Sequence, residues 1–410
     1  MTLFGGVVPI TAITFLMFCL FAILAVGYAL GRITIKGISL GSAGVFLVAL
    51  IFGCLFYNDL EAQLPSYTTN ALKIVENLGL ILFVSSVGFI AGPKFFSNMK
   101  KNFTSYVLLG FVIIISGALV AVACVYVGKL MGETDMERLS AIMSGLFAGA
   151  LTSTPAFSAA KASVATPEME QLVSVGYGIA YIFGVIGVVL FVQLMPKLMK
   201  VNMDEERAKL VAAEGSSDSK KEVGKLIELD DYGIAPFAIA AVIGIFIGMI
   251  KIPLSKAGLN GTTFSLTTTG GCLLASLVFG HFGRVGKVNI MPSSTTLKVF
   301  RELGLVLFLA GAGISGGARF VQEFKIDYFV YGIIMTILPM IIGFVFAKFV
   351  LKISLLNILG SITGGMTSTP ALGTLIHVAG TEDVAAAYAA TYPIALVAVV
   401  FASQFIIILF

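Results

Sequence analysis

The chain has 410 residues, of which 58% are hydrophobic and 12% are charged, and its mean hydropathy is +1.01. Soluble domains contain about 45–50% apolar and about 25% charged residues. This composition therefore excludes an ordinary soluble domain and indicates an integral membrane protein. The net charge of +4 is spread over short loops, so nucleic acid is not an expected partner and the charges report mainly on membrane orientation.

Apolar runs of about 20 residues recur along the chain, each long enough to cross a hydrocarbon core of about 30 Å as a helix. The first run has no basic leading stretch and no small-residue cleavage site, so we expect a permanent span. We therefore predict an all-α polytopic protein lying in a lipid bilayer. The segments, in chain order, are 8–31, 38–57, 74–92, 103–130, 140–166, 173–195, 234–250, 264–283, 302–318, 327–351, 355–380 and 388–410.

Metal, cofactor and enzyme chemistry are not expected. His281 and His377 lie far apart, with no Cys, Asp or Glu at ligand spacing, and no nucleophile–base set or phosphate loop is present in the sequence. The string "GAGISG" at 311–316 fits G-x-G-x-x-G but lies in an apolar segment, so we interpret it as helix-packing glycine. The cysteines all fall in apolar segments, where packing is expected rather than disulfides or zinc; they are Cys19, Cys54, Cys124 and Cys272.

The two halves of the chain match each other. "ENLGLILFVSSVGFIAGPKFF" at 76–96 aligns with "RELGLVLFLAGAGISGGARFV" at 301–321. Further on, "GLFAGALTSTP" at 145–155 aligns with "GSITGGMTSTP" at 360–370. The matching strings follow in the same order, which predicts two copies of one six-segment unit. The predicted domains are a first membrane repeat, 1–196, a charged linker, 197–233, and a second membrane repeat, 234–410.

Basic residues favour a re-entrant hairpin in each half, at about 140–166 and about 355–380. If these segments do not cross, sixteen Lys and Arg lie inside and six lie outside; if both cross, nine lie inside and thirteen outside. The positive-inside rule favours the first arrangement, with a cytoplasmic linker. Each half then has five transmembrane helices plus one hairpin, and the odd number of crossings makes the second half an inverted repeat, as in many secondary transporters.

The TSTP strings fall at the predicted hairpin turns, near the midplane, because Ser140 to Leu151 makes about 18 Å of helix. Proline suits the first helical position and the preceding threonine can cap it, so each string starts a helix whose free N–H groups and positive dipole end attract carboxylates or phosphates. The alternative is a proline-broken helix with self-capping hydroxyls. Polar non-helical backbone in hydrocarbon must be buried or line a cavity, which favours a central binding site where both tips meet. Its predicted residues are Thr152, Ser153, Thr154, Pro155, Thr367, Ser368, Thr369 and Pro370.

Charged and hydroxyl residues inside the segments are further candidates. Lys161 either pairs with a substrate carboxylate or reaches the outer surface with its ammonium group. Arg301 either grips a carboxylate bidentately or joins an interfacial ion-pair cluster. The other members of that cluster would be Lys73, Glu76, Lys298 and Glu302, and the mid-helix hydroxyl candidates are Ser85, Ser86 and Ser315.

The paired G-x-x-x-G-x-x-T-S-T-P-A strings, the duplicated unit and the hydrophilic segment between them resemble the aspartate:alanine exchanger family. The resemblance implies a bacterial inner-membrane antiporter for aspartate, alanine or dicarboxylates such as succinate, with both TSTP strings near the substrate. Many relatives carry a large cytosolic ligand-binding insert, which the short linker here does not match. We expect an elevator-type exchanger of small carboxylates, assembled as a homodimer; the alternatives are a sodium- or proton-coupled symporter and a passive anion channel.

Overall fold

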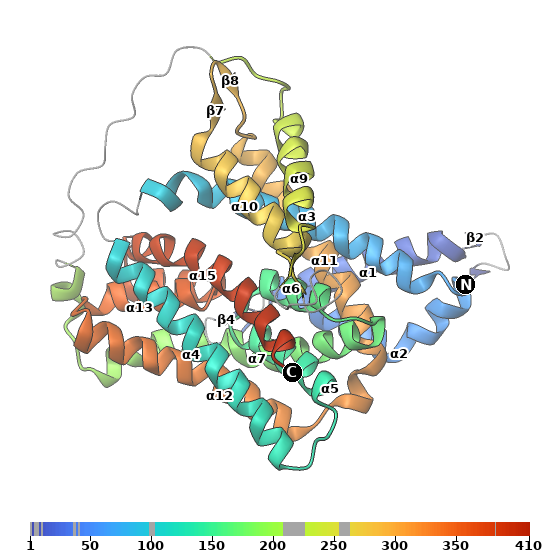
Figure 1. The fold of residues 1–410 in the computed structure, drawn as a ribbon, viewed down its shortest axis with the longest axis horizontal. Helices are drawn as coiled ribbons and strands as arrows, with labels where there is room; N and C mark the ends of the chain where they lie inside the picture. Colours follow the sequence, from blue (N-terminus) through green and yellow to red (C-terminus); the bar gives the residue numbers. More distant parts are fainter. Residues whose placement is uncertain are drawn as a thin grey trace.

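A computed structural model describes residues 2–3, 8–9, 11–35, 38–39, 42–97, 103–207, 226–253, 263–381 and 383–410. Helices dominate these residues (Figure 1). Those of the first half are α1 (Ala12–Gly31), α2 (Ala43–Gln63), α3 (Thr68–Ser97), α4 (Phe103–Leu130), α5 (Met136–Ala150), α6 (Thr154–Ser163) and α7 (Pro167–Leu198). Those of the second half are α9 (Ile234–Gly248), α10 (Thr267–Phe282), α11 (Ser294–Glu323), α12 (Ile326–Val345), the π-helix η4 (Phe346–Val350), α13 (Leu355–Gly365), α14 (Thr369–Ala379) and α15 (Val384–Ile408).

Strands are confined to short antiparallel pairs beside the helices. Each pair has two residues per strand, and all four lie in connections or at the N-terminus. They are β1 (Thr2–Leu3) with β2 (Val8–Pro9), β3 (Thr34–Ile35) with β4 (Ile38–Ser39), β5 (Ile252–Pro253) with β6 (Thr263–Phe264), and β7 (Arg284–Val285) with β8 (Val288–Asn289). The described architecture is therefore all-α.

Seven helices in the described part of the chain are long and apolar enough to cross a membrane: α1, α2, α3, α4, α7, α12 with η4, and α15. α9 and α13 are apolar but shorter. Large apolar side chains point outward, for example Phe21 at 68% and Phe246 at 74% exposure. A soluble protein rarely exposes so many large apolar side chains to water, whereas the lipid of a membrane accommodates them. The chain is a multi-pass membrane protein.

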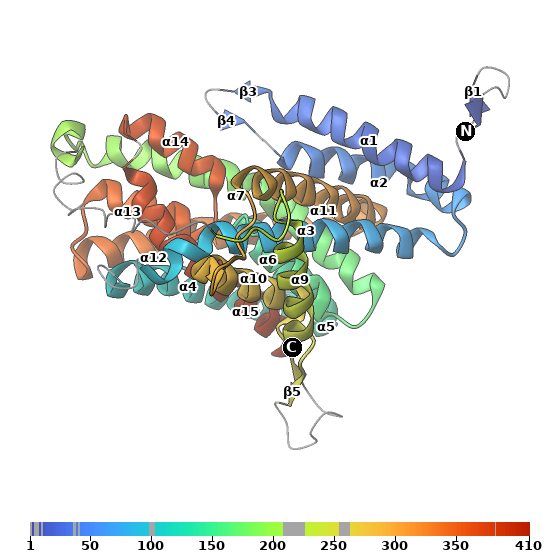
Figure 2. The ribbon, with the colours of Figure 1, turned by 90° about the horizontal axis from the view of Figure 1, so that it is seen from above.

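The helices form two groups, and each group combines the two halves of the chain. In the first, α3 packs along α11, α2 packs on α11 and α1, and α10 packs on α3 and α9. In the second, α5 packs on α7, α13 on α15, and α4 on α12. Figures 1 and 2 show α1 and α2 at one end of the molecule and α4, α12 and α13 at the other. Contacts of α7 with α11, α6 with α10 and α15 with α3 join the groups.

Glycines bring the interrupted helices against their neighbours. A Cβ at Gly145 of α5 would lie 2.1 Å from the Val173 carbonyl oxygen of α7. The matching Gly360 of α13 would place a Cβ 2.6 Å from the Val384 carbonyl oxygen of α15. Both distances are far below van der Waals contact, so only glycine permits this packing. A Cβ at Gly311, in the "GAGISG" string, would likewise lie 2.5 Å from Glu76 Cγ, which confirms its packing role.

Several predicted segment boundaries were wrong: α2 ends at Gln63 rather than 57, and α7 begins at Pro167 rather than 173. α3 begins at Thr68 rather than 74, and α11 begins at Ser294 rather than 302, after the Ser293 hydroxyl accepts a hydrogen bond from Thr296 N at 3.0 Å. The charged residues near both starts therefore lie within helices, where neighbouring helices supply partners. The segment expected at 140–166 is also displaced toward the N-terminus: α5 begins at Met136, and α6 ends at Ser163.

Candidate functional site

The two TSTP loops have the same backbone conformation. α5 ends at Ala150 and α6 begins at Thr154. Between them Thr152 adopts φ 52°, in the left-handed region, and its N–H donates to Gly149 O at 2.9 Å. The N–H of Ser153 donates to Ala148 O at 2.9 Å. This pair of bonds is the Schellman termination of a helix, in which the left-handed position is usually glycine.

The second loop repeats this geometry. α13 ends at Gly365, and Thr367 adopts φ 51°. The N–H groups of Thr367 and Ser368 donate to Gly364 O and Thr363 O, each at 3.0 Å. A β-branched residue in the left-handed region costs on the order of 1–3 kcal/mol, and such strain concentrates at functional sites. Threonine in a position suited to glycine therefore points to a use for its hydroxyl.

Each of these hydroxyls binds the opposite loop. Thr152 Oγ1 donates to Met366 O at 3.0 Å, and Thr367 Oγ1 donates to Leu151 O at 2.8 Å. Both threonines are buried. Two segments more than 200 residues apart thus hold each other reciprocally, and the tips meet as the sequence predicted.

The helix starts after the two loops differ in one hydrogen bond. Ser153 caps α6 by accepting from Ala156 N at 3.3 Å, with Pro155 in the first turn. Ser368 occupies the same position before α14, but within the described residues its fully buried hydroxyl has no hydrogen-bond partner. α14 begins at Thr369, followed by Pro370, as predicted; the side chains of these two residues lie outside the described ones. The start of α14 therefore keeps one hydroxyl available.

A cavity of about 720 Å³ opens beside the loops, within the range of about 300–1,000 Å³ typical of small-molecule sites. Both loops contribute to its wall, together with side chains of α3, α7, α11, α14 and α15. The lining residues are Ser42, Phe83, Val87, Ile90, Ala91, Thr152, Thr154, Pro155, Tyr181, Arg301, Glu302, Leu305, Thr367, Leu372, Tyr388, Ala389, Tyr392, Pro393 and Leu396. The cavity lies between the two helix groups and contains residues of both.

Arg301 is the cation on this wall. No hydrogen bond or ion pair joins its guanidinium to another described residue, whereas the neighbouring Glu302 accepts a hydrogen bond from Tyr28 Oη at 2.8 Å. Tyr388 and Tyr392 stack in the wall with ring centroids 5.0 Å apart and an interplanar angle of 19°. A guanidinium, phenol hydroxyls and loop hydroxyls can together receive a carboxylate.

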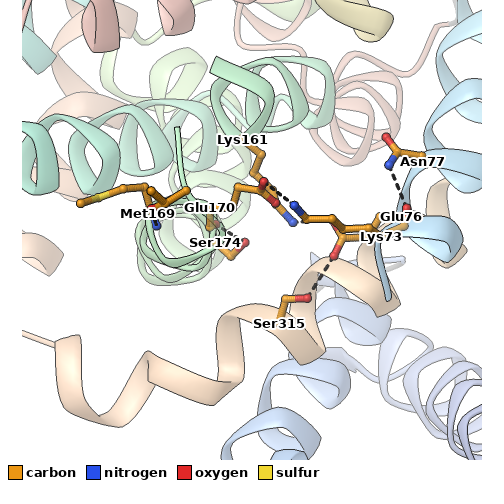
Figure 3. Close-up of polar contacts among 9 residues, drawn as sticks. Lys73, Glu76, Asn77, Lys161, Met169, Glu170, Ser174 and Ser315 are labelled. Carbon is orange, nitrogen blue, oxygen red and sulfur yellow. Dashed lines mark hydrogen bonds and ion pairs between the residues drawn. The ribbon is translucent and has the colours of Figure 1, made fainter. Parts of the chain in front are cut away.

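Lys161 lies outside the cavity wall, and its expected reach to the surface was wrong. Its ammonium forms an ion pair with Glu76, and the two side chains are 7% and 8% exposed. Ser315 Oγ donates to the other oxygen of Glu76 at 3.1 Å (Figure 3). The pair brings together α6, α3 and α11 in the protein interior. A lysine without a partner would extend its ammonium group to the surface, but Glu76 provides Lys161 with a partner in the interior.

The expected cluster of Lys73, Glu76, Lys298, Arg301 and Glu302 does not form among the described residues. Lys73 Nζ instead lies 2.9 Å from Glu170 Oε1 of α7, Glu76 pairs with Lys161, and Glu302 bonds to Tyr28. The reason is that α3 and α11 turn these residues toward different neighbouring helices.

Ser85 and Ser86 are fully buried in α3 but do not line the cavity. Ser86 Oγ donates to Leu82 O at 2.7 Å within its own helix.

The tyrosines of the wall were not predicted as site residues. The sequence signal that could have found them is the match of Tyr392 to Tyr177 in the last helix of the other half. Of the further candidates, the structure places Arg301 on the cavity wall and leaves Lys161, Ser85, Ser86 and Ser315 off it.

The ends of the interrupted helices lie near one another. Arg138, at the start of α5, pairs with Glu323 of α11, and Glu168, at the start of α7, lies 2.7 Å from Arg319 of α11. Both ends of the α5–α6 unit therefore lie against the C-terminal end of α11. α7 then runs for 32 residues, about 48 Å of helix. Shortly after its end, Glu206 and Arg207 contact the first residue of α13 and the last residue of α14. The two interrupted units consequently extend from opposite ends of α7.

Apolar spans around an internal cavity with interrupted helices at its wall define a polytopic membrane transport protein, and comparison with known proteins agrees. A family model described as "Predicted Permease Membrane Region", with the short name Asp-Al_Ex, matches residues 19–197 and 236–408. The chain belongs to the aspartate:alanine exchanger family.

Similar bacterial proteins are described as uncharacterized transporters. One from Bacteroides thetaiotaomicron is 28% identical, over 93% of this chain and 96% of that protein. Others are from Bacteroides fragilis, at 27% over 93% and 96%, and from Geobacter sulfurreducens, at 24% over 95% and 97%. The first alignment covers 536 positions, of which this chain fills about 381 (93% of 410). That relative alone fills the remaining positions, about 155, so it has many residues that this chain lacks.

Proposed function

We propose that the protein exchanges small carboxylates across the bacterial inner membrane by an elevator form of alternating access. The observation that carries the proposal is that both TSTP loops, bonded to each other through Thr152 and Thr367, line one cavity together with Arg301. Candidate solutes are C4-dicarboxylates and acidic amino acids, with aspartate, alanine or succinate suggested by the family.

The helix packing supports two equivalent, inverted halves. The pairing of α2 with α11 has a counterpart in α10 with α3, and that of α7 with α12 has one in α15 with α4. The family model also matches two ranges of similar length, one in each half. Both ends of α5–α6 lie at the same end of α11, and both ends of α13–α14 contact Glu206 and Arg207, which follow the other end of α7. We therefore interpret both units as re-entrant hairpins. Interrupted helices from inverted halves commonly build the sites of secondary transporters.

The wall chemistry supports an anionic solute. Helix N-termini carry a positive partial charge and free N–H groups, and the starts of α6 and α14 both face the loop region. Arg301 adds a full charge to the lining, and Thr152, Thr154 and Thr367 also line the cavity. Two positive helix ends and one guanidinium suit a solute with two carboxylates.

The division into two helix groups supports the elevator mode. The group with α5–α6 and α13–α14 would form the moving domain, and the group built on α3 and α11 the scaffold. Polar pairs cross this interface, including Lys161 with Glu76 and Lys73 with Glu170. Such contacts can exchange as the domain slides, so the structure would represent one of two end states.

A proton-coupled symporter is the second candidate, and one observation favours it. Glu302 lies on the cavity wall beside Arg301, and a carboxylate there could take up a proton together with the solute. An exchanger does not require that step, so the need for an ion gradient separates the two functions.

The test is counterflow in proteoliposomes. Vesicles are loaded with unlabelled succinate, aspartate or alanine, and uptake of the labelled solute is followed with choline in place of sodium. We expect uptake into loaded vesicles only, without a sodium or proton gradient. Uptake that is equal in empty vesicles, or that needs either gradient, would overturn exchange.

The role of Arg301 is tested with matched variants in the same assay. Arg301→Gln removes the guanidinium from the wall, and we expect at least a tenfold loss of uptake. Lys298→Gln removes a positive charge one turn earlier on α11, where the side chain is exposed and does not line the cavity, and should leave uptake near the wild-type rate. Equal activity of both variants would remove Arg301 from the site.

A further inference from the structure

The linker begins by contacting both ends of the second interrupted unit. Glu206 Oε2 accepts a hydrogen bond at 2.8 Å from the N–H of Leu355, the first residue of α13. The adjacent Arg207 donates from Nε to the carbonyl of Ala379, the last residue of α14, at 2.6 Å. Two consecutive residues therefore hold the start of one helix and the end of the other.

Both charges match the helix ends that they contact. An acidic group is stabilising at a helix N-terminus and a basic group at a C-terminus, because each opposes the local partial charge. Glu206 is 4% exposed, so solvent screens this interaction little. Ser354, at the N-cap of α13, accepts a hydrogen bond at 3.1 Å from the Asn357 side chain rather than from a main-chain N–H of the first turn. Glu206 supplies the acceptor for the main chain. Arg207 is fixed further by Asp204, 2.8 Å from its guanidinium.

Among the described residues, the first interrupted unit is capped locally at its start. Asp135, directly before α5, accepts from Arg138 N at 3.0 Å and so caps its own helix. Glu206 and Arg207, by contrast, lie 149 and 172 positions from the residues that they bind. They also fall in the segment 198–235, which lies between the two ranges matched by the family model. The asymmetry between the units is therefore located in the linker.

We propose that Glu206 and Arg207 form a clamp that positions α13 and α14 and thereby couples the linker to the cavity. α13 has 11 residues, about 16 Å of helix, and it leads directly into the loop of Thr367 and Ser368. A displacement at the clamped ends is passed along two short helices to that loop. Glu206 and Arg207 act here as positioning residues, because neither lines the cavity.

The clamp is tested first without transport, by hydrogen–deuterium exchange of the intact protein in micelles. Glu206→Ala and Arg207→Ala should each speed amide exchange in peptides from 355–379 by about twofold to thirtyfold, the range for losing one helix cap. Peptides from 136–163 serve as the internal control and should not change. Glu205→Ala is the matched variant, since Glu205 is the exposed neighbouring acid, and it should exchange like wild type.

Unchanged exchange at 355–379, or equal acceleration along the whole chain, would overturn the clamp. If either alanine variant fails to insert, Glu206→Gln and Arg207→Gln should give the same local pattern with smaller amplitude.

The coupling to the cavity rests on the proposed function and is measured separately as solute counterflow. We expect both alanine variants to lower the maximal rate at least threefold with little change in KM, and Arg207→Lys to recover part of the rate. Local acceleration of exchange with wild-type counterflow would overturn the coupling while leaving the clamp. If the wild-type protein moves no carboxylate, the proposed function fails, and hydrogen–deuterium exchange still decides whether the clamp exists.

Discussion

The buried pair of Lys161 and Glu76 makes a quantitative prediction about stability. Lys161→Met leaves the Glu76 carboxylate with the Ser315 hydroxyl but without its cation, in a site where the side chains are 7% and 8% exposed. Removing one partner of a buried ion pair costs about 3–5 kcal/mol, because the remaining charge stays desolvated. We therefore expect this single substitution to lower the free energy of unfolding by about that amount.

A second ion pair on the same helix provides the control. Lys73 and Glu170 also join α3 to another helix, α7, but their side chains are 36% and 22% exposed. Pairs with that degree of exposure contribute about 0.2–1 kcal/mol. Lys73→Met should therefore be several times less destabilising than Lys161→Met, although both substitutions remove one lysine.

The measurement is unfolding by titration of sodium dodecyl sulfate into detergent micelles, followed by far-ultraviolet circular dichroism, since the chain contains no tryptophan. The double variant Lys161→Met with Glu76→Gln should recover stability, because replacing both charges of a buried pair is often neutral or stabilising. If Lys161→Met is no more harmful than Lys73→Met, or if the double variant is as unstable as the sum of its single variants, the reasoning from burial is refuted.

Three further predictions concern the loops and the orientation. Ser153→Leu and Ser368→Leu should each abolish counterflow in proteoliposomes while leaving circular dichroism unchanged, since the added side chains fill space beside the cavity; normal transport by both would make the strings structural breaks. Thr152→Val, which keeps the left-handed strain but loses the bond to the opposite loop, should cost about 0.5–1.5 kcal/mol, whereas Thr152→Gly should cost less in the same titration because it relieves the strain. Single cysteines at Asn58 and Asn202, in a background without native cysteines, should react from opposite sides of the membrane; reaction from one side would contradict inverted halves.

Much of the fold could be predicted because the membrane imposes simple rules. Length and apolarity located the helices. The strings with proline after threonine located the starts of α6 and α14 to within one residue, since each helix begins at the threonine and the serine before it is the N-cap. The starts of α3 and α11 were missed because charged residues usually mark the membrane surface. Here Glu76 lies inside a helix and is neutralised by Lys161, 85 positions away, which no local pattern reveals.

The candidate site could be predicted only in part for a related reason. The loops are recognisable in the sequence, since each carries its hydroxyls and proline in one short string. The rest of the cavity wall comes from α3, α7, α11 and α15, and it depends on which face each helix turns inward. Tyr388 and Tyr392 resemble ordinary apolar-segment tyrosines until α15 packs beside the loops. Arg301 could be predicted because a charge in an apolar region requires an explanation.

The reciprocal bonds between the loops also bear on how the two halves can diverge in evolution. Each threonine hydroxyl binds a main-chain carbonyl, of Met366 in one direction and of Leu151 in the other. A carbonyl is present whatever side chain the residue carries, and the two halves already differ at these matched positions. Mutation at 151 or 366 therefore leaves the acceptor in place, whereas loss of either threonine removes a donor that nothing in the partner half can restore. Amino-acid substitutions should therefore accumulate at positions 151 and 366 rather than at Thr152 and Thr367.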